Sequence, residues 1–94
     1  MKVNVKRASL TRTVVFTVEG ATPVRRQISP RGIRPDTLVV DVTDGKVSRI
    51  SITGPCVTGG VTEPDRRLTE KWGPWNLDQA PTWARAIAKS LEAK

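Results

Sequence analysis

The residues best suited to chemistry are four arginines in the stretch TPVRRQISPRGIRPD, which spans residues 22–36. The stretch also holds three prolines and a glycine, has no acid before its last residue, and places its arginines at Arg25, Arg26, Arg31 and Arg34. An arginine side chain presents a planar fork of N–H donors that fits a phosphate group through two contacts. The stretch therefore indicates phosphate binding. The alternative is that these arginines only keep exposed strand and loop positions soluble.

The net charge of the 94-residue chain lies entirely in its first third. Residues 1–35 carry eight basic residues against Glu19 alone, whereas residues 36–94 carry eight basic and eight acidic residues, so the first segment accounts for the whole +7. A concentrated positive field draws polyanions to one part of a protein surface. We therefore expect a nucleic acid, or an acidic partner protein, to bind through seven of these residues, namely Lys6, Arg7, Arg12, Arg25, Arg26, Arg31 and Arg34.

The chain offers little for catalysis. It has no histidine, which removes the usual general base at neutral pH, the Ser-His-Asp and Cys-His arrangements and histidine metal sites. Cys56 has no partner of this kind and is expected to be a small structural residue. Asp41 and Asp44 flank a turn, where aspartate bonds nearby backbone, and no calcium-loop spacing is present. We predict a non-enzymatic protein with no catalytic residue, metal, cofactor or small-molecule substrate.

Three tryptophans lie in the charge-neutral part of the chain. Tryptophan is enriched at binding hot spots, so a patch of Trp72, Trp75 and Leu77, or an exposed sheet edge, would suit a protein-interaction module. The alternative is that the tryptophans pack in the core or cover it, which Trp83 favours because it lies on the apolar side of a helix. A structural role in a virion or in an oligomer, through an edge strand near residues 23–28, is a third interpretation.

Apolar residues alternate along the first half of the chain as they do in half-buried strands. Leu10, Val14, Phe16 and Val18 share one parity, and Gly20 ends their segment. A shorter alternation over residues 24–28, bracketed by prolines, predicts a short or edge strand. Valine is the most abundant apolar residue, with twelve copies, and its branched side chain favours strands over helices.

The stretch TLVVDVTDGKVSRISITG, residues 37–54, predicts a hairpin around an Asp-Gly turn. A two-residue turn would divide the apolar residues between both faces. A three-residue loop over residues 43–45, with Gly45 in the left-handed conformation of a bulge, gathers them on one face. Because a one-residue slip turns every side chain over, we predict this register, which pairs Leu38 with Ile50 and places Val40, Val42 and Ile52 on the same side.

The next stretch, GPCVTGGV, residues 54–61, is expected to be a surface loop. Its glycines are spaced as in a phosphate-binding loop, but Gly60 and Val61 stand where that motif requires lysine and then serine or threonine. Residues 62–73 carry the signals of a short helix, with Thr62 as the N-cap residue and Gly73-Pro74 beyond the end.

The C-terminal residues predict an amphipathic helix over about residues 79–93. Trp83, Ile87 and Leu91 recur every four residues, and small alanines flank them. Such alanines let a helix lie close to a sheet. The fold expected is α+β, a small antiparallel β-sheet of about four to five strands packed against a C-terminal α-helix.

The chain length indicates a single domain, with strands over about residues 2–53, a loop and short helix over 54–78 and the helix over 79–93. No apolar run approaches the roughly 18 residues of a membrane span, and the first residues lack the apolar core of a signal peptide. We therefore expect a cytoplasmic protein with no membrane partner. The single cysteine excludes an internal disulfide.

The hairpin LVVDVTDGKVSRISITGP, followed by Trp72 and by LDQAPTWARAIA, resembles small uncharacterised proteins of actinobacteria and their phages. The resemblance covers about residues 37–88 and leaves the basic first third uncovered. It implies a small accessory role, such as binding and modulating a host protein in the host cytoplasm. It implies no activity and no site residues.

Overall fold

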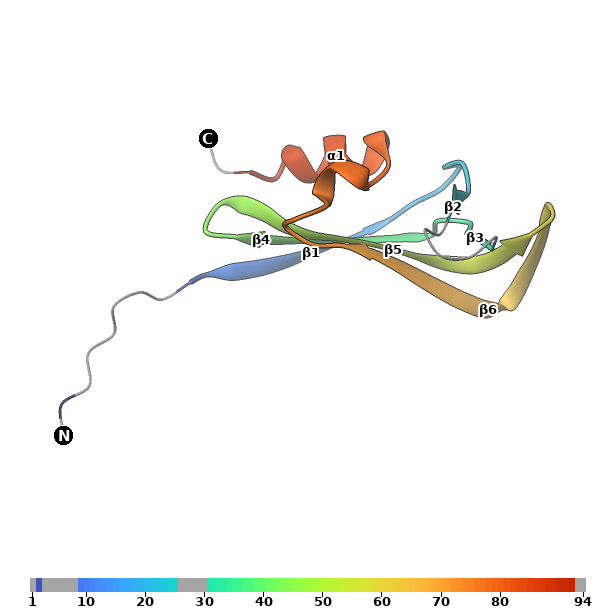
Figure 1. Ribbon diagram of the computed structural model, residues 1–94, viewed down its shortest axis with the longest axis horizontal. Helices are drawn as coiled ribbons and strands as arrows, with labels where there is room; N and C mark the ends of the chain where they lie inside the picture. The colour runs from blue at the N-terminus through green and yellow to red at the C-terminus, as the bar shows by residue number, and fades with distance from the viewer. Residues whose placement is uncertain (1, 3–8, 26–30, 93–94) are drawn as a thin grey trace.

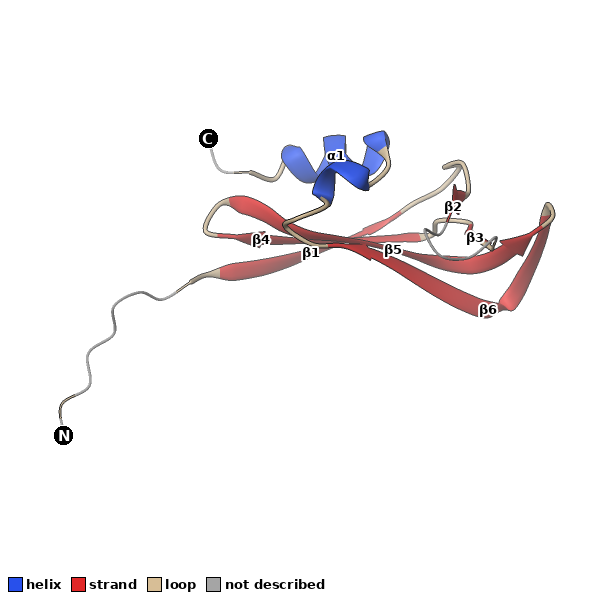
Figure 2. Ribbon diagram, in the orientation of Figure 1, coloured by secondary structure: helices blue, strands red, loops and turns tan. Residues whose placement is uncertain are grey.

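The protein is an antiparallel β-sheet with one helix over one of its faces (Figure 1), as described by a computed structural model. The structure describes residues 2, 9–25 and 31–92. The elements, dominated by strands (Figure 2), are β1 (Thr11–Thr17), β2 (Val24–Arg25), β3 (Gly32–Ile33), β4 (Thr37–Thr43), β5 (Lys46–Thr58), β6 (Val61–Trp72), the 3-10 helix η1 (Leu77–Gln79) and α1 (Thr82–Lys89). The α+β class is confirmed, with six strands in place of the four to five predicted.

The long strand β5 organises the sheet. On one side β5 pairs with β6; on the other it pairs with β4 along its first half and with β3 along its second half. β1 lies outside β4, and β2 lies outside β3. Between β3 and β4 the segment 34–36 contains one residue more than the part of β5 beside it, so the chain arches there.

Gly54 lies under this arch and has to be a glycine. A Cβ atom at this position would collide with the carbonyl group of Arg34. Two hydrogen bonds hold the arch against β5 on either side of Gly54, from Arg34 N to Pro55 O at 3.0 Å and from Asp36 N to Thr53 O at 3.0 Å. The close approach of two backbones therefore depends on the missing side chain.

The hairpin of β4 and β5 buries the side chains that were predicted to be buried, but its strands pair in a different register. The turn is the two-residue Asp44-Gly45 turn, in which both residues have positive φ, 51° and 82°. The extra residue is Ser48 in β5, which stands unpaired between two ladder pairs. Leu38 therefore pairs with Ile52 rather than with Ile50. The predicted three-residue loop is wrong because a bulge inside a strand resets the side-chain parity as well as a bulge in the turn does.

Residues 54–73 contradict the predicted loop and short helix. Residues 54–58 continue β5, Gly59 and Gly60 form a two-residue turn with φ of 57° and 81°, and β6 runs back from Val61. The sequence Val-Thr-Gly-Gly-Val-Thr places strand-forming residues symmetrically around a glycine turn, which is a hairpin signal. Pairing along β5 outweighs the helix-capping pattern at Thr62.

α1 is shorter than predicted but packs as expected. It begins at Thr82, after Pro81 at the N-cap position, and ends at Lys89, while the 3-10 turn η1, Leu77–Gln79, lies almost wholly before the predicted range. Ala84 and Ala88 are buried against the sheet, and Trp83 packs at the edge of the core. The most deeply buried side chains belong to the strands, with Ile33, Leu38, Val40, Ile50, Ile52 and Cys56 at most 1% exposed.

The first strand agrees in part with its prediction. Val14, Phe16 and Val18 are half-buried, as their common parity indicates, but Leu10 is exposed. Of the strand expected over residues 24–28, only β2 can be compared, and Val24 in it is buried. Residues 26–28, and the two valines near the start of the chain, lie outside the described residues.

Candidate functional site

The sheet has one face packed under α1 and an opposite face on which no described element lies. Side chains alternate between the two faces along each strand, and residues paired directly across strands point to the same face. We call the second surface the open face. Its residues are Thr11, Thr13, Val15 and Thr17 of β1; Thr37, Val39, Asp41 and Thr43 of β4; Lys46, Arg49, Ser51, Thr53, Pro55 and Val57 of β5; and Thr62, Arg67, Thr69 and Lys71 of β6.

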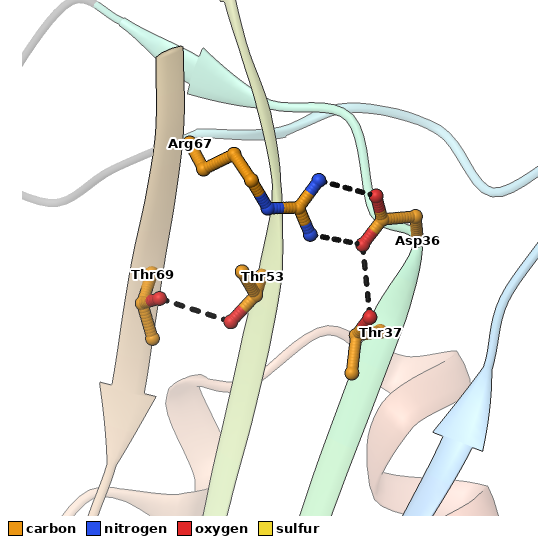
Figure 3. A network of polar contacts seen from close by, with 5 residues as sticks. All are labelled: Asp36, Thr37, Thr53, Arg67 and Thr69. Atoms are coloured by element: carbon orange, nitrogen blue, oxygen red, sulfur yellow. Dashed lines mark hydrogen bonds and ion pairs between the residues drawn. The ribbon is translucent and has the colours of Figure 1, made fainter. Parts of the chain in front are cut away.

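Threonine hydroxyl groups form rows across the open face. Thr13 Oγ1 donates a hydrogen bond to Asp41 Oδ1 at 2.7 Å, and Thr53 and Thr69 share a hydroxyl hydrogen bond of 2.9 Å across β5 and β6 (Figure 3). The strands fix these pairs because β-branched residues lie opposite each other in the ladder. The open face therefore carries many hydroxyl hydrogen-bond donors and few large apolar side chains.

Basic side chains outnumber acids on the open face. Arg49 lies opposite Asp41, and Lys71 lies opposite Ser51. The Arg34 side chain joins the same face, because its Nε donates to Thr62 Oγ1 at 3.2 Å across the end of β5. Arg25, at the end of β2, instead lines a pocket with Trp72 and Trp83 on the α1 side of the sheet. The described basic residues on the open face are Arg34, Lys46, Arg49, Arg67 and Lys71, and the described acids are Asp36 and Asp41.

One of these cations is neutralised by an ion pair. Arg67 on β6 binds the carboxylate of Asp36 through two parallel hydrogen bonds of 2.8 Å, and Thr37 Oγ1 donates a third at 2.9 Å (Figure 3). The Arg67 bonds hold the pKa of the Asp36 carboxyl below its ordinary value. The ion pair spans β5 and joins β6 to the arch, so Arg67 has a structural contact within the protein.

The structure brings together only part of the predicted basic site. Arg34 lies on the open face. Arg25 does not, because it lines a pocket with Trp72 and Trp83. Arg12 does not either: it pairs with buried Val42, and its Nη2 donates to the carbonyl oxygen of Leu91 at 2.7 Å on the α1 side. Arg31 is half-buried just before β3. Lys6, Arg7 and Arg26 lie outside the described residues.

Four cations of the open face were missed from the sequence, Lys46, Arg49, Arg67 and Lys71. They lie in the part of the chain whose net charge is zero, so charge counting gives them no weight. Reading residues 62–73 as a helix also hid the parity that Arg67, Thr69 and Lys71 share on β6. The Gly-Gly turn was the signal that would have revealed this strand and its alternation.

The predicted patch of Trp72, Trp75 and Leu77 does not form as a surface. Trp72 is 2% exposed and lies in the core opposite Ile50, and Leu77 is half-buried against the same core. Only Trp75 is exposed, at 84%, in the turn that follows β6. The core interpretation of Trp72 and Trp83 is the one that agrees with the structure.

Other chemistry has little basis in the described part of the chain. Cys56 is fully buried, with its Sγ 3.6 Å from Thr58 Oγ1. Residues 2, 9–25 and 31–92 contain no group of three or more Cys, Asp or Glu side chains placed to hold a metal ion. None of the described helices has the length and apolar character needed to cross a membrane.

Comparison of the chain with protein-family models, with curated proteins and with solved structures gives no match. The resemblance to actinobacterial and phage proteins therefore stays a prediction. Functional inference depends on the geometry of the chain itself.

Proposed function

We propose that this protein is a non-enzymatic binding protein that holds a polyanion, nucleic acid, on the open face of its sheet. The observation that supports the proposal is the surplus of five basic over two acidic described residues on the face that α1 leaves uncovered. Arginine and lysine on a common surface concentrate a positive field where a phosphate chain can lie.

The composition of the open face favours contacts to phosphates over contacts to bases. Arginine and lysine bind phosphate oxygens, and threonine hydroxyls such as those of Thr37, Thr53 and Thr69 are further donors. The face as defined has no aromatic residue on which a base could stack. Binding should therefore depend steeply on salt and little on base sequence.

The cations lie in two groups along the strands. Arg49 and Lys71 lie near one end of β5, and Arg34 lies near its other end. The row from Lys71 to Arg67 alone covers about 13 Å, at a rise of about 3.3 Å per residue. A backbone with several successive phosphates would reach both groups, whereas a single phosphate would reach one. The expected ligand is therefore a nucleic-acid chain and not a mononucleotide.

A matched pair of double variants tests the proposal. Arg49→Ala/Lys71→Ala removes one arginine and one lysine from the open face, and Arg85→Ala/Lys89→Ala removes the same charges from exposed positions of α1. Binding to a fluorescent DNA duplex is measured by anisotropy over a range of salt concentrations. On B-DNA each lost phosphate contact reduces the slope of log K against log salt by about 0.9, so the open-face variant should lose about 1.8.

The α1 variant is expected to keep the slope of the parent protein. Thermal unfolding by circular dichroism shows that both variants are folded. If the α1 variant loses as much of the slope as the open-face variant does, the ligand does not lie on the open face.

A further inference from the structure

β1 presents an edge with which no described strand pairs. A backbone hydrogen bond lies at each end of β1, from Asp44 N to Leu10 O and from Val18 N to Asp36 O, both at 2.9 Å. These two bonds show which residues of β1 have their backbone groups directed toward β4. In an antiparallel ladder the residues alternate, so the even-numbered residues of β1 face β4. The backbone N–H and C=O groups of four residues then point outward, those of Thr11, Thr13, Val15 and Thr17.

The outer edge of β6 is protected in a way that β1 is not. In β6 the pairing with β5 passes from Arg67 to Glu63, so three residues, Pro64, Asp65 and Arg66, stand outside the ladder. Proline, charges and irregular pairing are the devices that keep an edge strand from accepting another strand.

By contrast, the outward residues of β1 are uncharged and β-branched, and Val15 is 64% exposed. The one charge within β1 belongs to Arg12, which is directed toward α1 by its bond to Leu91 O at 2.7 Å. Nothing in β1 therefore opposes the addition of a strand.

We propose that β1 pairs with β1 of a second copy of this chain, antiparallel and centred on Val14. In this register Thr13 lies opposite Val15 of the second copy, and Thr11 lies opposite Thr17. No like charges are opposed, because Arg12 lies opposite the uncharged Phe16. The edge is thus complementary to itself along the whole of β1.

The pairing also joins the two sheets with matching faces. A two-fold axis through the Val14 pair, perpendicular to the sheet, places both α1 helices on one side and both open faces on the other. The dimer would be held by main-chain hydrogen bonds and by the β-branched side chains of the edge. It does not depend on polyanion binding, but it would extend the open face across the strands into the second copy.

A disulfide test reports the register directly. In the proposed dimer Val14 lies opposite Val14 of the second copy, as a non-hydrogen-bonded pair. The two Cα atoms of such a pair are about 4.5 Å apart, a distance that a disulfide can span. Val14→Cys should therefore give a covalent dimer under mild oxidation, seen on a non-reducing gel and by intact mass. Val15→Cys is the control. In the same register the Cα atoms of residue 15 in the two copies would be farther apart than the roughly 7 Å that a disulfide can span. The parent chain controls for Cys56, which is fully buried.

A second pair of variants tests the edge itself. Val15→Pro removes an outward N–H without breaking a bond to β4, and Val15→Thr keeps that N–H and a β-branched side chain. Light scattering after size-exclusion chromatography should give a dimer for the parent and for Val15→Thr, and a folded monomer for Val15→Pro. The proposal is overturned if the parent is monomeric at every concentration, if Val15→Pro is as dimeric as the parent, or if Val15→Cys cross-links as readily as Val14→Cys.

Discussion

Gly54→Val is expected to lower the free energy of unfolding by about 4 kcal/mol. The new side chain would collide with the Arg34 carbonyl group, so the arch over residues 34–36 would have to leave β5. Overpacking of this kind costs about 1–3 kcal/mol, and the two backbone hydrogen bonds of the arch contribute roughly 1 kcal/mol each. A domain of this size has a total stability of about 5–15 kcal/mol, so the melting temperature should fall by at least about 15 °C.

Gly59→Ala provides the control for this effect. Gly59 has a positive φ of 57°, but nothing lies within 4 Å of a Cβ atom built there. Gly59→Ala should lower the free energy of unfolding by only about 1–2 kcal/mol, which is the cost of placing an alanine in the left-handed conformation. Thermal unfolding of both variants separates the two causes. An equal loss of stability in the two variants would mean that the arch leaves room for a side chain at position 54.

Trp72→Ala and Trp72→Phe should differ sharply in stability. Trp72 is 2% exposed in the core, and truncation of such a residue to alanine costs about 3–5 kcal/mol. Its indole Nε1–H has no hydrogen-bond acceptor among the described residues. An unsatisfied buried donor is itself unfavourable by about 1–3 kcal/mol, so phenylalanine, which lacks the donor, should cost less than about 1.5 kcal/mol.

Urea unfolding of both Trp72 variants, followed by circular dichroism, measures this difference. Trp83→Phe is the comparison variant, because Trp83 lies at the edge of the core and is half-buried. If Trp72→Phe is as destabilised as Trp72→Ala, the indole N–H makes a bond that its replacement breaks.

Local patterns predicted those parts of the fold in which one face of one element is buried. The alternation of Leu38 and Val40 with polar neighbours identified the core side of β4, and the four-residue spacing of Trp83 and Ile87 identified α1. The hairpin register escaped prediction because Ser48 shifts the parity inside a strand, where no turn residue marks it. β6 was mistaken for a helix because its proline and charges suit an exposed helix turn as well as a protected edge strand.

The candidate site was less predictable than the fold because it depends on pairings between distant residues. The Asp36–Arg67 ion pair and the Arg34–Thr62 hydrogen bond both cross β5, and no short stretch of sequence contains either. Net charge by segment favoured the first third of the chain, yet the register brings Arg49 and Lys71 from the neutral part to the same face. Arg12 carries the same charge but lies on the α1 side, because the even-numbered residues of β1 point their side chains to that side of the sheet.

Nuclear magnetic resonance mapping of a bound DNA duplex tests the central claim most directly. The chain has 94 residues, so each backbone amide can be followed during a titration at low salt. We expect the largest chemical-shift changes at the open-face positions around Arg34, Arg49 and Lys71, and no change in the amide signals of α1 from Ala84 to Lys89. If the changes centre on α1 or on the turn that carries Trp75, while the open face is unchanged, the nucleic acid does not bind the open face.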